Sequence, residues 1–106
     1  MNKGKDMLDH LQEMLNEIKA GTAQLFDVRE QNEWDLGHLK LASLVPLTQL
    51  NEGALPDQHD TGKKTYLHCR SGVRVQMAAP LLQDLGFQEV IPLSEGYDEL
   101  VQEGLE

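Results

Sequence analysis

Residues 65–74, TYLHCRSGVR, join a short run of strand-forming residues to a polar turn that holds the single cysteine of the chain. The segment 65–68 is short and rich in residues that favour strands, as expected of a central parallel strand. Over residues 72–85 the apolar side chains recur at helical spacing, and a glycine follows as a stop. Cys69 is therefore predicted to lie between the end of a strand and the start of a helix, where parallel sheets bind their ligands.

The same alternation of strand and helix signals continues along the chain. Apolar runs predict further strands at 24–28, 43–45 and 89–93, and helical spacing predicts helices over 7–18, 29–35 and 97–101. Residues 51–64 are predicted to form a connecting loop, with one helical turn before it. This order favours an α/β fold in three layers, with helices on both faces of a mainly parallel central sheet of about five strands. Pro80 falls inside the helix after the cysteine and should kink it.

The chain of 106 residues has the length of one domain, and residues 1–21 are expected to form an amphipathic helix that packs on it. There is no internal repeat and no domain linker. No apolar run approaches the ~18 residues of a membrane span, and the N-terminus lacks a signal-peptide core. We therefore expect a cytoplasmic single-domain protein that does not bind membranes.

Charge and cysteine content exclude several classes of partner. The net charge of −9 argues against binding to nucleic acids or anionic membranes. The single cysteine excludes an internal disulfide and a cysteine-based zinc site, and no spacing of His, Asp and Glu indicates a metal. Residues 61–83 nevertheless hold four basic residues and no acidic one. This window, which includes Cys69, indicates a local anion site, with chance clustering of charge as the alternative.

The turn 69–74 has the features of an anion cradle. Its backbone N–H groups should point inward at the start of a helix, where the helix dipole adds partial positive charge. Gly72 permits the curled backbone, and Arg70 and Arg74 raise the positive potential. A cysteine at the mouth of this cradle should be largely thiolate near neutral pH. The alternative for a lone cysteine is an inert, buried small residue.

Two motifs resemble those of the rhodanese-like sulfurtransferases. The first lies within residues 27–47, and the second begins with the loop 69–74. The matching residues are Asp27-Val28-Arg29, Glu33-Trp34, Gly37-His38-Leu39, Ala42 and Pro46-Leu47 in the first motif and, after the loop, Leu82, Leu85-Gly86-Phe87 and Glu95-Gly96-Tyr97 in the second. Three positions depart from the usual family pattern, namely Leu41, Pro80 and Ser94.

The resemblance implies a rhodanese-like fold and a thiosulfate sulfurtransferase of the rhodanese type, in which Cys69 carries the transferred sulfur as a persulfide. The donor would be thiosulfate or a similar small anion, and the acceptor a thiol, a protein thiol or cyanide. No metal and no organic cofactor is implied. The loop residues that match substrate-binding positions of the family are Arg70, Ser71, Gly72, Val73 and Arg74, and those that match positions supporting the site are Asp27, Arg29 and His38.

Other polar side chains have simpler structural explanations. We expect His38 to make a structural hydrogen bond, and His68, which precedes Cys69 on a strand, to point to the opposite face of the sheet. Trp34 is interpreted as a packing residue. An acidic cluster in the same helix is interpreted as a solvated face rather than as paired catalytic carboxylates, and it comprises Glu30, Glu33 and Asp35.

Two other functions stay open. One is a protein-recognition or regulatory module that keeps the fold without the reaction. The other is a cysteine phosphatase or arsenate reductase on a related fold, which uses a similar cradle. In those enzymes the cysteine and arginine are separated by one residue more than the four between Cys69 and Arg74. The smaller ring of amides suits one sulfur atom better than a phosphoryl group with three equatorial oxygens.

Overall fold

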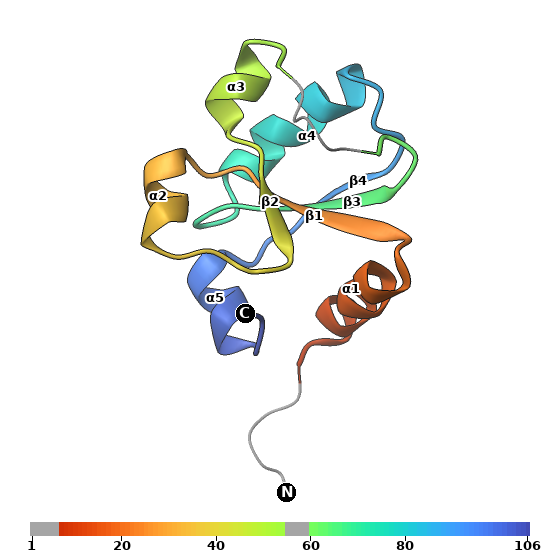
Figure 1. The fold of residues 1–106 in the computed structure, drawn as a ribbon, viewed down its shortest axis with the longest axis vertical. Coiled ribbons are helices and arrows are strands. Elements are labelled where there is room, and N and C mark those ends of the chain that lie inside the picture. Colours follow the sequence, from red (N-terminus) through yellow and green to blue (C-terminus); the bar gives the residue numbers. More distant parts are fainter. Residues whose placement is uncertain (1–6, 55–59) are drawn as a thin grey trace, which may run out of the picture.

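The computed structural model describes residues 7–54 and 60–106, and its centre is a parallel β-sheet (Figure 1). The strands are β1 (Ala23–Asp27), β2 (Ala42–Leu44), β3 (Lys64–His68) and β4 (Val90–Pro92), in the spatial order β2-β1-β3-β4. The parallel sheet is confirmed, but the described residues form four strands rather than about five. The observed number is thus one lower than expected.

Helices cover both faces of the sheet. They are α1 (Asp9–Ala20), α2 (Gln31–Leu36), α3 (Leu47–Asn51), α4 (Arg74–Asp84) and α5 (Tyr97–Gln102). Figure 1 shows α3 and α4 over one face and α1 and α5 over the other, which confirms the three-layer α/β architecture. Gly21 ends α1 with a φ of 82°, a left-handed conformation that glycine adopts without strain. Pro80 is exposed, and α4 continues through it to Asp84.

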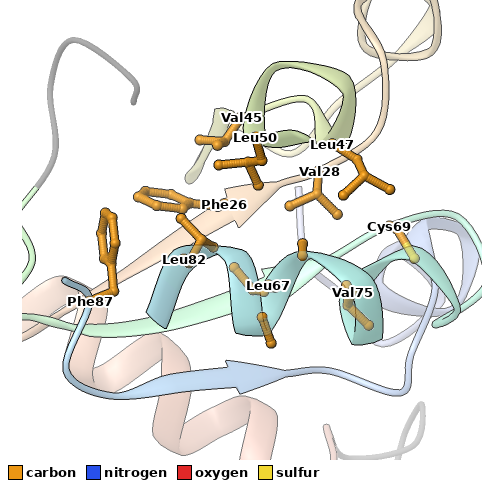
Figure 2. Close-up of a cluster of buried hydrophobic side chains, with 12 residues drawn as sticks. Phe26, Val28, Val45, Leu47, Leu50, Leu67, Cys69, Val75, Leu82 and Phe87 are labelled. Carbon is orange, nitrogen blue, oxygen red and sulfur yellow. The ribbon is translucent and has the colours of Figure 1, made fainter. Parts of the chain in front are cut away.

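One apolar cluster fills the space between the sheet and helices α3 and α4 (Figure 2). Phe26 and Leu67 from the strands and Leu82 from α4 are each no more than 1% exposed. Phe26 meets Phe87 edge to face, with the ring centroids 5.6 Å apart. Burial of one such side chain stabilises the fold by about 1.5–3 kcal/mol. Cys69 is a member of this cluster, so the core and the candidate site share a residue.

A second apolar cluster lies on the opposite face of the sheet, against α1 and α5. Leu11 and Met14 of α1 and Leu100 of α5 are fully buried there. The helical stripe in the sequence thus faces the sheet, as an amphipathic helix requires. No helix in the described ranges is long and apolar enough to cross a membrane.

Candidate active site

The loop between β3 and α4 curls tightly around the thiol of Cys69. Gly72 donates its backbone N–H to the Cys69 Sγ over 3.2 Å. Gly72 has a φ of 85°, and a Cβ at this position would lie 2.7 Å from the backbone oxygen of Ser94. Both the left-handed backbone and the close approach therefore require glycine.

Residues 94–97, which we call the loop wall, lie directly against the cysteine loop. The backbone N–H of Tyr97 donates to the backbone oxygen of Cys69 over 2.9 Å. A Cβ on Gly96 would lie only 1.9 Å from the backbone oxygen of Arg70, so the two segments meet backbone to backbone. The shape of the cysteine loop thus depends on a segment that begins after β4.

Cys69 has no exposed surface, and its thiol lies beneath the loop among apolar side chains. Figure 2 shows the sulfur beside the first turn of α4, near Val75. The sulfur thus contacts an amide of the cysteine loop and is covered by that loop, so it is not exposed at the surface. The Cys69 side chain is turned toward α4, whereas that of the preceding His68 lies on the other face of the sheet. The sulfur therefore lies beside the positive end of the α4 dipole.

Arg74 is engaged by a carboxylate from α2. Its Nη1 and Nη2 donate to the two carboxylate oxygens of Glu33 over 2.6 and 2.8 Å. These hydrogen bonds lower the pKa of Glu33 from the usual 4.5 to about 2, and the same contact raises the pKa of Arg74. Arg74 thus connects the end of the cysteine loop to α2 through a bidentate ion pair.

The interpretation of the α2 acids as a solvated face is wrong for two of the three. Glu33 also accepts the backbone N–H of Glu30, and Glu30 accepts the hydroxyl of Thr48 over 2.7 Å. Asp35 is exposed, as expected. The spacing of Glu30 and Glu33 is that of a helix-capping pair, which is a signal that could have found their contact. The ion pair with Arg74 spans 41 positions and has no local signal.

Asp27 and Arg29 form a buried ion pair at the end of β1. The Arg29 Nη2 donates to Asp27 Oδ2 and to the backbone oxygen of Gly37, each over 2.8 Å. The Arg29 guanidinium carbon lies 4.3 Å from the ring centroid of Tyr97, within range of a cation–π contact. This pair joins β1, the end of α2 and the loop wall, and the ring contact with Tyr97 has no signal in the sequence.

His68 is buried on the face of the sheet opposite Cys69. Its ring stacks on Tyr97, with centroids 6.3 Å apart, whereas Cys69 belongs to the cluster under α4. His68 Nε2 lies 3.5 Å from Asp27 Oδ2 and has no hydrogen-bond partner among the described residues. Burial lowers the pKa of His68 below the usual 6.5, while the Asp27 charge acts in the opposite direction. The two neighbours therefore do not form a Cys–His dyad, and this agrees with the prediction that they point to opposite faces of the sheet.

His38 and Trp34 complete the end of α2. His38 Nδ1 donates to the backbone oxygen of Trp34 over 2.9 Å, and the two rings stack 3.7 Å apart. The structural hydrogen bond predicted for His38 is present, and its exposed ring satisfies a carbonyl near the end of the helix. Trp34 packs on this ring and is half-buried.

A pocket of about 220 Å³ opens beside the cysteine loop. Arg70, which is exposed, contributes a positive charge to it, and Leu36 contributes an apolar side chain that is 91% exposed. No group of three His, Cys, Asp or Glu side chains in the described parts of the chain is placed to hold a metal ion. The pocket is lined by Arg29, Glu33, Leu36, Gly37, Arg70, Tyr97 and Asp98.

Curated relatives of this chain include an uncharacterized protein and a probable sulfurtransferase. Uncharacterized protein YqhL of Bacillus subtilis is 40% identical over 83 residues, which cover 76% of this chain and 64% of YqhL. The probable adenylyltransferase/sulfurtransferase MoeZ of Mycobacterium tuberculosis is 32% identical over 72 residues, which cover 68% of this chain and 18% of MoeZ. The chain thus spans less than two thirds of the length of either relative.

The fold and the sequence also match a family as a whole. The solved structure of the human single-domain sulfurtransferase TSTD1 has a TM-score of 0.75 at 21% identity and covers 94% of this chain and 98% of its own. At that identity the likeness establishes the fold. The family described as Rhodanese-like domain matches residues 10–103. Because this match takes in the sheet, both helical layers and the cysteine loop, the chain belongs to the rhodanese-like domain family.

Proposed function

We propose that the protein is a sulfurtransferase that carries sulfane sulfur on Cys69, with thiosulfate or a similar anion as the donor. The observation that carries this proposal is the contact between the Gly72 N–H and the Cys69 Sγ, at 3.2 Å in a loop that only glycine can shape. A backbone donor that points at a thiol favours its negative form and the negative sulfur adduct that follows.

The proposed first step transfers one sulfur atom. The Cys69 thiolate attacks the outer sulfur of thiosulfate, the sulfur–sulfur bond of thiosulfate breaks, and sulfite leaves with the bonding electron pair. The outer sulfur stays on Cys69 as a persulfide anion, and the charges balance without a proton, metal or cofactor. Amides of the cysteine loop and the start of α4 are the groups that would stabilise the terminal sulfur.

In the second step an acceptor takes the sulfur away. An acceptor thiolate attacks the terminal sulfur of the persulfide, which restores the Cys69 thiolate and leaves a persulfide on the acceptor. Cyanide reacts in the same way and gives thiocyanate. MoeZ is a probable adenylyltransferase/sulfurtransferase, and its similarity to this chain supports the proposed class of reaction.

The charge around the loop supports an anionic donor. Arg70 is exposed at the pocket, whereas Arg29 and Arg74 are held by Asp27 and Glu33. We therefore assign attraction of the donor to Arg70 and fastening of the loop to Arg74. Since Cys69 is fully buried, the donor reaches the sulfur only when the loop opens locally.

The test is to incubate the reduced protein with thiosulfate and to measure its intact mass. We expect the mass of one added sulfur atom, removed again by cyanide with release of thiocyanate. Cys69→Ala is the control and should acquire no sulfur. If the wild-type protein also acquires none, from thiosulfate or from another sulfane-sulfur donor, the proposed function is wrong.

The complete burial of Cys69 favours a second candidate, a protein-recognition module in which the cysteine only fills the core. Such a module would bind its partner equally well with Cys69 or with alanine in its place. The mass measurement separates the two candidates, because a core-filling cysteine would not acquire sulfur.

A further inference from the structure

Glu95 occupies the middle of the loop wall and reaches across to the first helix of the chain. Its side chain is 11% exposed, and its Oε2 lies 2.8 Å from Nε2 of His10, in the first turn of α1. The other carboxylate oxygen, Oε1, is buried and has no hydrogen-bond partner among the described residues. The hydrogen bond with His10 therefore offsets part of the free-energy cost of burying this carboxylate.

Backbone hydrogen bonds hold the loop wall at Tyr97 and hold Leu93, the residue directly before it, but none holds its centre. Leu93 donates its N–H to Leu67, and Tyr97 donates to Cys69, each over 2.9 Å. Within the described chain, the amides of Ser94 and Glu95 donate to no backbone oxygen. The side chain of Glu95 thus provides the tether for the part of the wall that no backbone hydrogen bond holds.

This central part of the wall sets the shape of the cysteine loop. The Ser94 backbone oxygen fills the space in which a Cβ on Gly72 would lie, and Gly96 allows the closest approach to the Arg70 backbone oxygen. Because the contacts are between backbone atoms, a small outward movement of the wall would remove the support of the Gly72 amide. That amide is the donor to the Cys69 Sγ.

We propose that the Glu95–His10 pair positions the loop wall against the cysteine loop, so that Glu95 is a positioning residue for the sulfur transfer proposed above. The inference rests on that function only for its catalytic part. Its structural part, that α1 supports the shape of the cysteine loop through His10, stands on the geometry alone. A consequence is that α1 serves the site as well as the core.

The test is amide hydrogen exchange of the reduced full-length protein, without any sulfur donor. His10→Ala should raise the exchange rates of the Gly72 and Tyr97 amides by about two- to fivefold, the size expected from loss of a partly exposed polar contact. The Val28 amide, which donates to His68 between β1 and β3, should be unchanged. His10→Gln should restore slow exchange, because its amide nitrogen can donate to Glu95.

The matched control is Glu17→Gln, which weakens a different tether of the same helix. Glu17 accepts from the Tyr66 hydroxyl over 2.6 Å and from Lys64 Nζ over 3.0 Å, so it joins α1 to β3 away from the cysteine loop. This variant should leave exchange of Gly72 and Tyr97 at the wild-type rate. A general loss of stability would raise exchange throughout the chain in both variants.

Turnover of thiosulfate gives the second measurement. His10→Ala should lower kcat by about two- to fivefold and leave KM unchanged, since the pair holds the loop and does not touch the donor. Unchanged exchange at Gly72 and Tyr97 in His10→Ala, or a uniform rise over all amides, would overturn the inference. If exchange changes locally as expected while the wild-type protein acquires no sulfur, the proposed function fails and the positioning role stands.

Discussion

Replacing Glu33 with glutamine should weaken the attachment of the cysteine loop to α2. The variant keeps the shape of the side chain but removes the charge that pairs with Arg74 over 2.6 and 2.8 Å. The lowering of the Glu33 pKa from 4.5 to about 2 corresponds to roughly 3 kcal/mol if it were fully expressed. Because Glu33 and Arg74 are 22% and 28% exposed, solvent screening reduces this to about 1–2 kcal/mol.

The pH dependence gives a sharper test of the same pair. The pKa of Glu33 is lower in the folded protein, so its contribution to the free energy of unfolding is complete above pH 4.5 and is lost as the pH falls from 4.5 toward 2. The difference in stability between the wild type and Glu33→Gln should therefore shrink over that window.

Urea unfolding followed by circular dichroism measures both quantities, at neutral pH and at steps down to pH 3. Asp35→Asn is the matched control, since Asp35 is an exposed acid on the same helix and its side chain hydrogen-bonds only to Gln31 among the described residues. This control should differ from the wild type by less than about 0.5 kcal/mol. A Glu33→Gln variant as stable as the control, or a stability difference that stays constant with pH, would refute the reasoning.

Three further outcomes are expected. Cys69→Ser and Cys69→Ala should both abolish thiosulfate sulfurtransfer while circular dichroism shows a folded protein. The serine variant should be the less stable of the two because its hydroxyl enters an apolar cluster. Residual turnover in the alanine variant would contradict the assignment of the nucleophile. The protein should transfer sulfur faster than it hydrolyses an aryl phosphate, and cysteine-dependent phosphate release above the rate of sulfur transfer would overturn the reaction class. The free energy of unfolding should fall as the pH drops below 6.5. The reason is that burial lowers the pKa of His68 in the folded protein, so His68 is protonated in the unfolded chain at a higher pH than in the folded one. His68→Gln should flatten this part of the pH profile, and an unaltered profile would exclude His68 as its cause.

The parts of the fold that were predictable from the sequence are those with local signals. The strand β3, the loop and α4 follow one another within about twenty residues, so strand-forming residues, a glycine and helical spacing were enough to place Cys69 between them. The three-layer architecture followed in the same way, since alternating short strands and helices build a parallel sheet covered on both faces.

The parts that were not predictable depend on contacts between distant segments. Nothing near Glu33 in the sequence indicates Arg74, and the pair forms only because the topology brings α2 beside the start of α4. The complete burial of Cys69 depends on how residues 94–97 lie against the cysteine loop, which no local pattern indicates. The tether from Glu95 to His10 spans 85 positions, so it too required the folded chain.

The position of the thiol also determines how the protein behaves toward oxidation. A disulfide brings two Cα atoms to within about 5.5 Å of each other and needs both sulfur atoms to be free on facing surfaces. The only cysteine of this chain lies fully covered in the core, beneath a loop that the neighbouring wall holds closed. While the loop is closed, two folded copies therefore cannot become linked through Cys69, and air oxidation yields a dimer only through chains whose loop has opened locally. Bulky thiol reagents are excluded for the same reason, whereas a chain unfolded in denaturant exposes the thiol to both reactions.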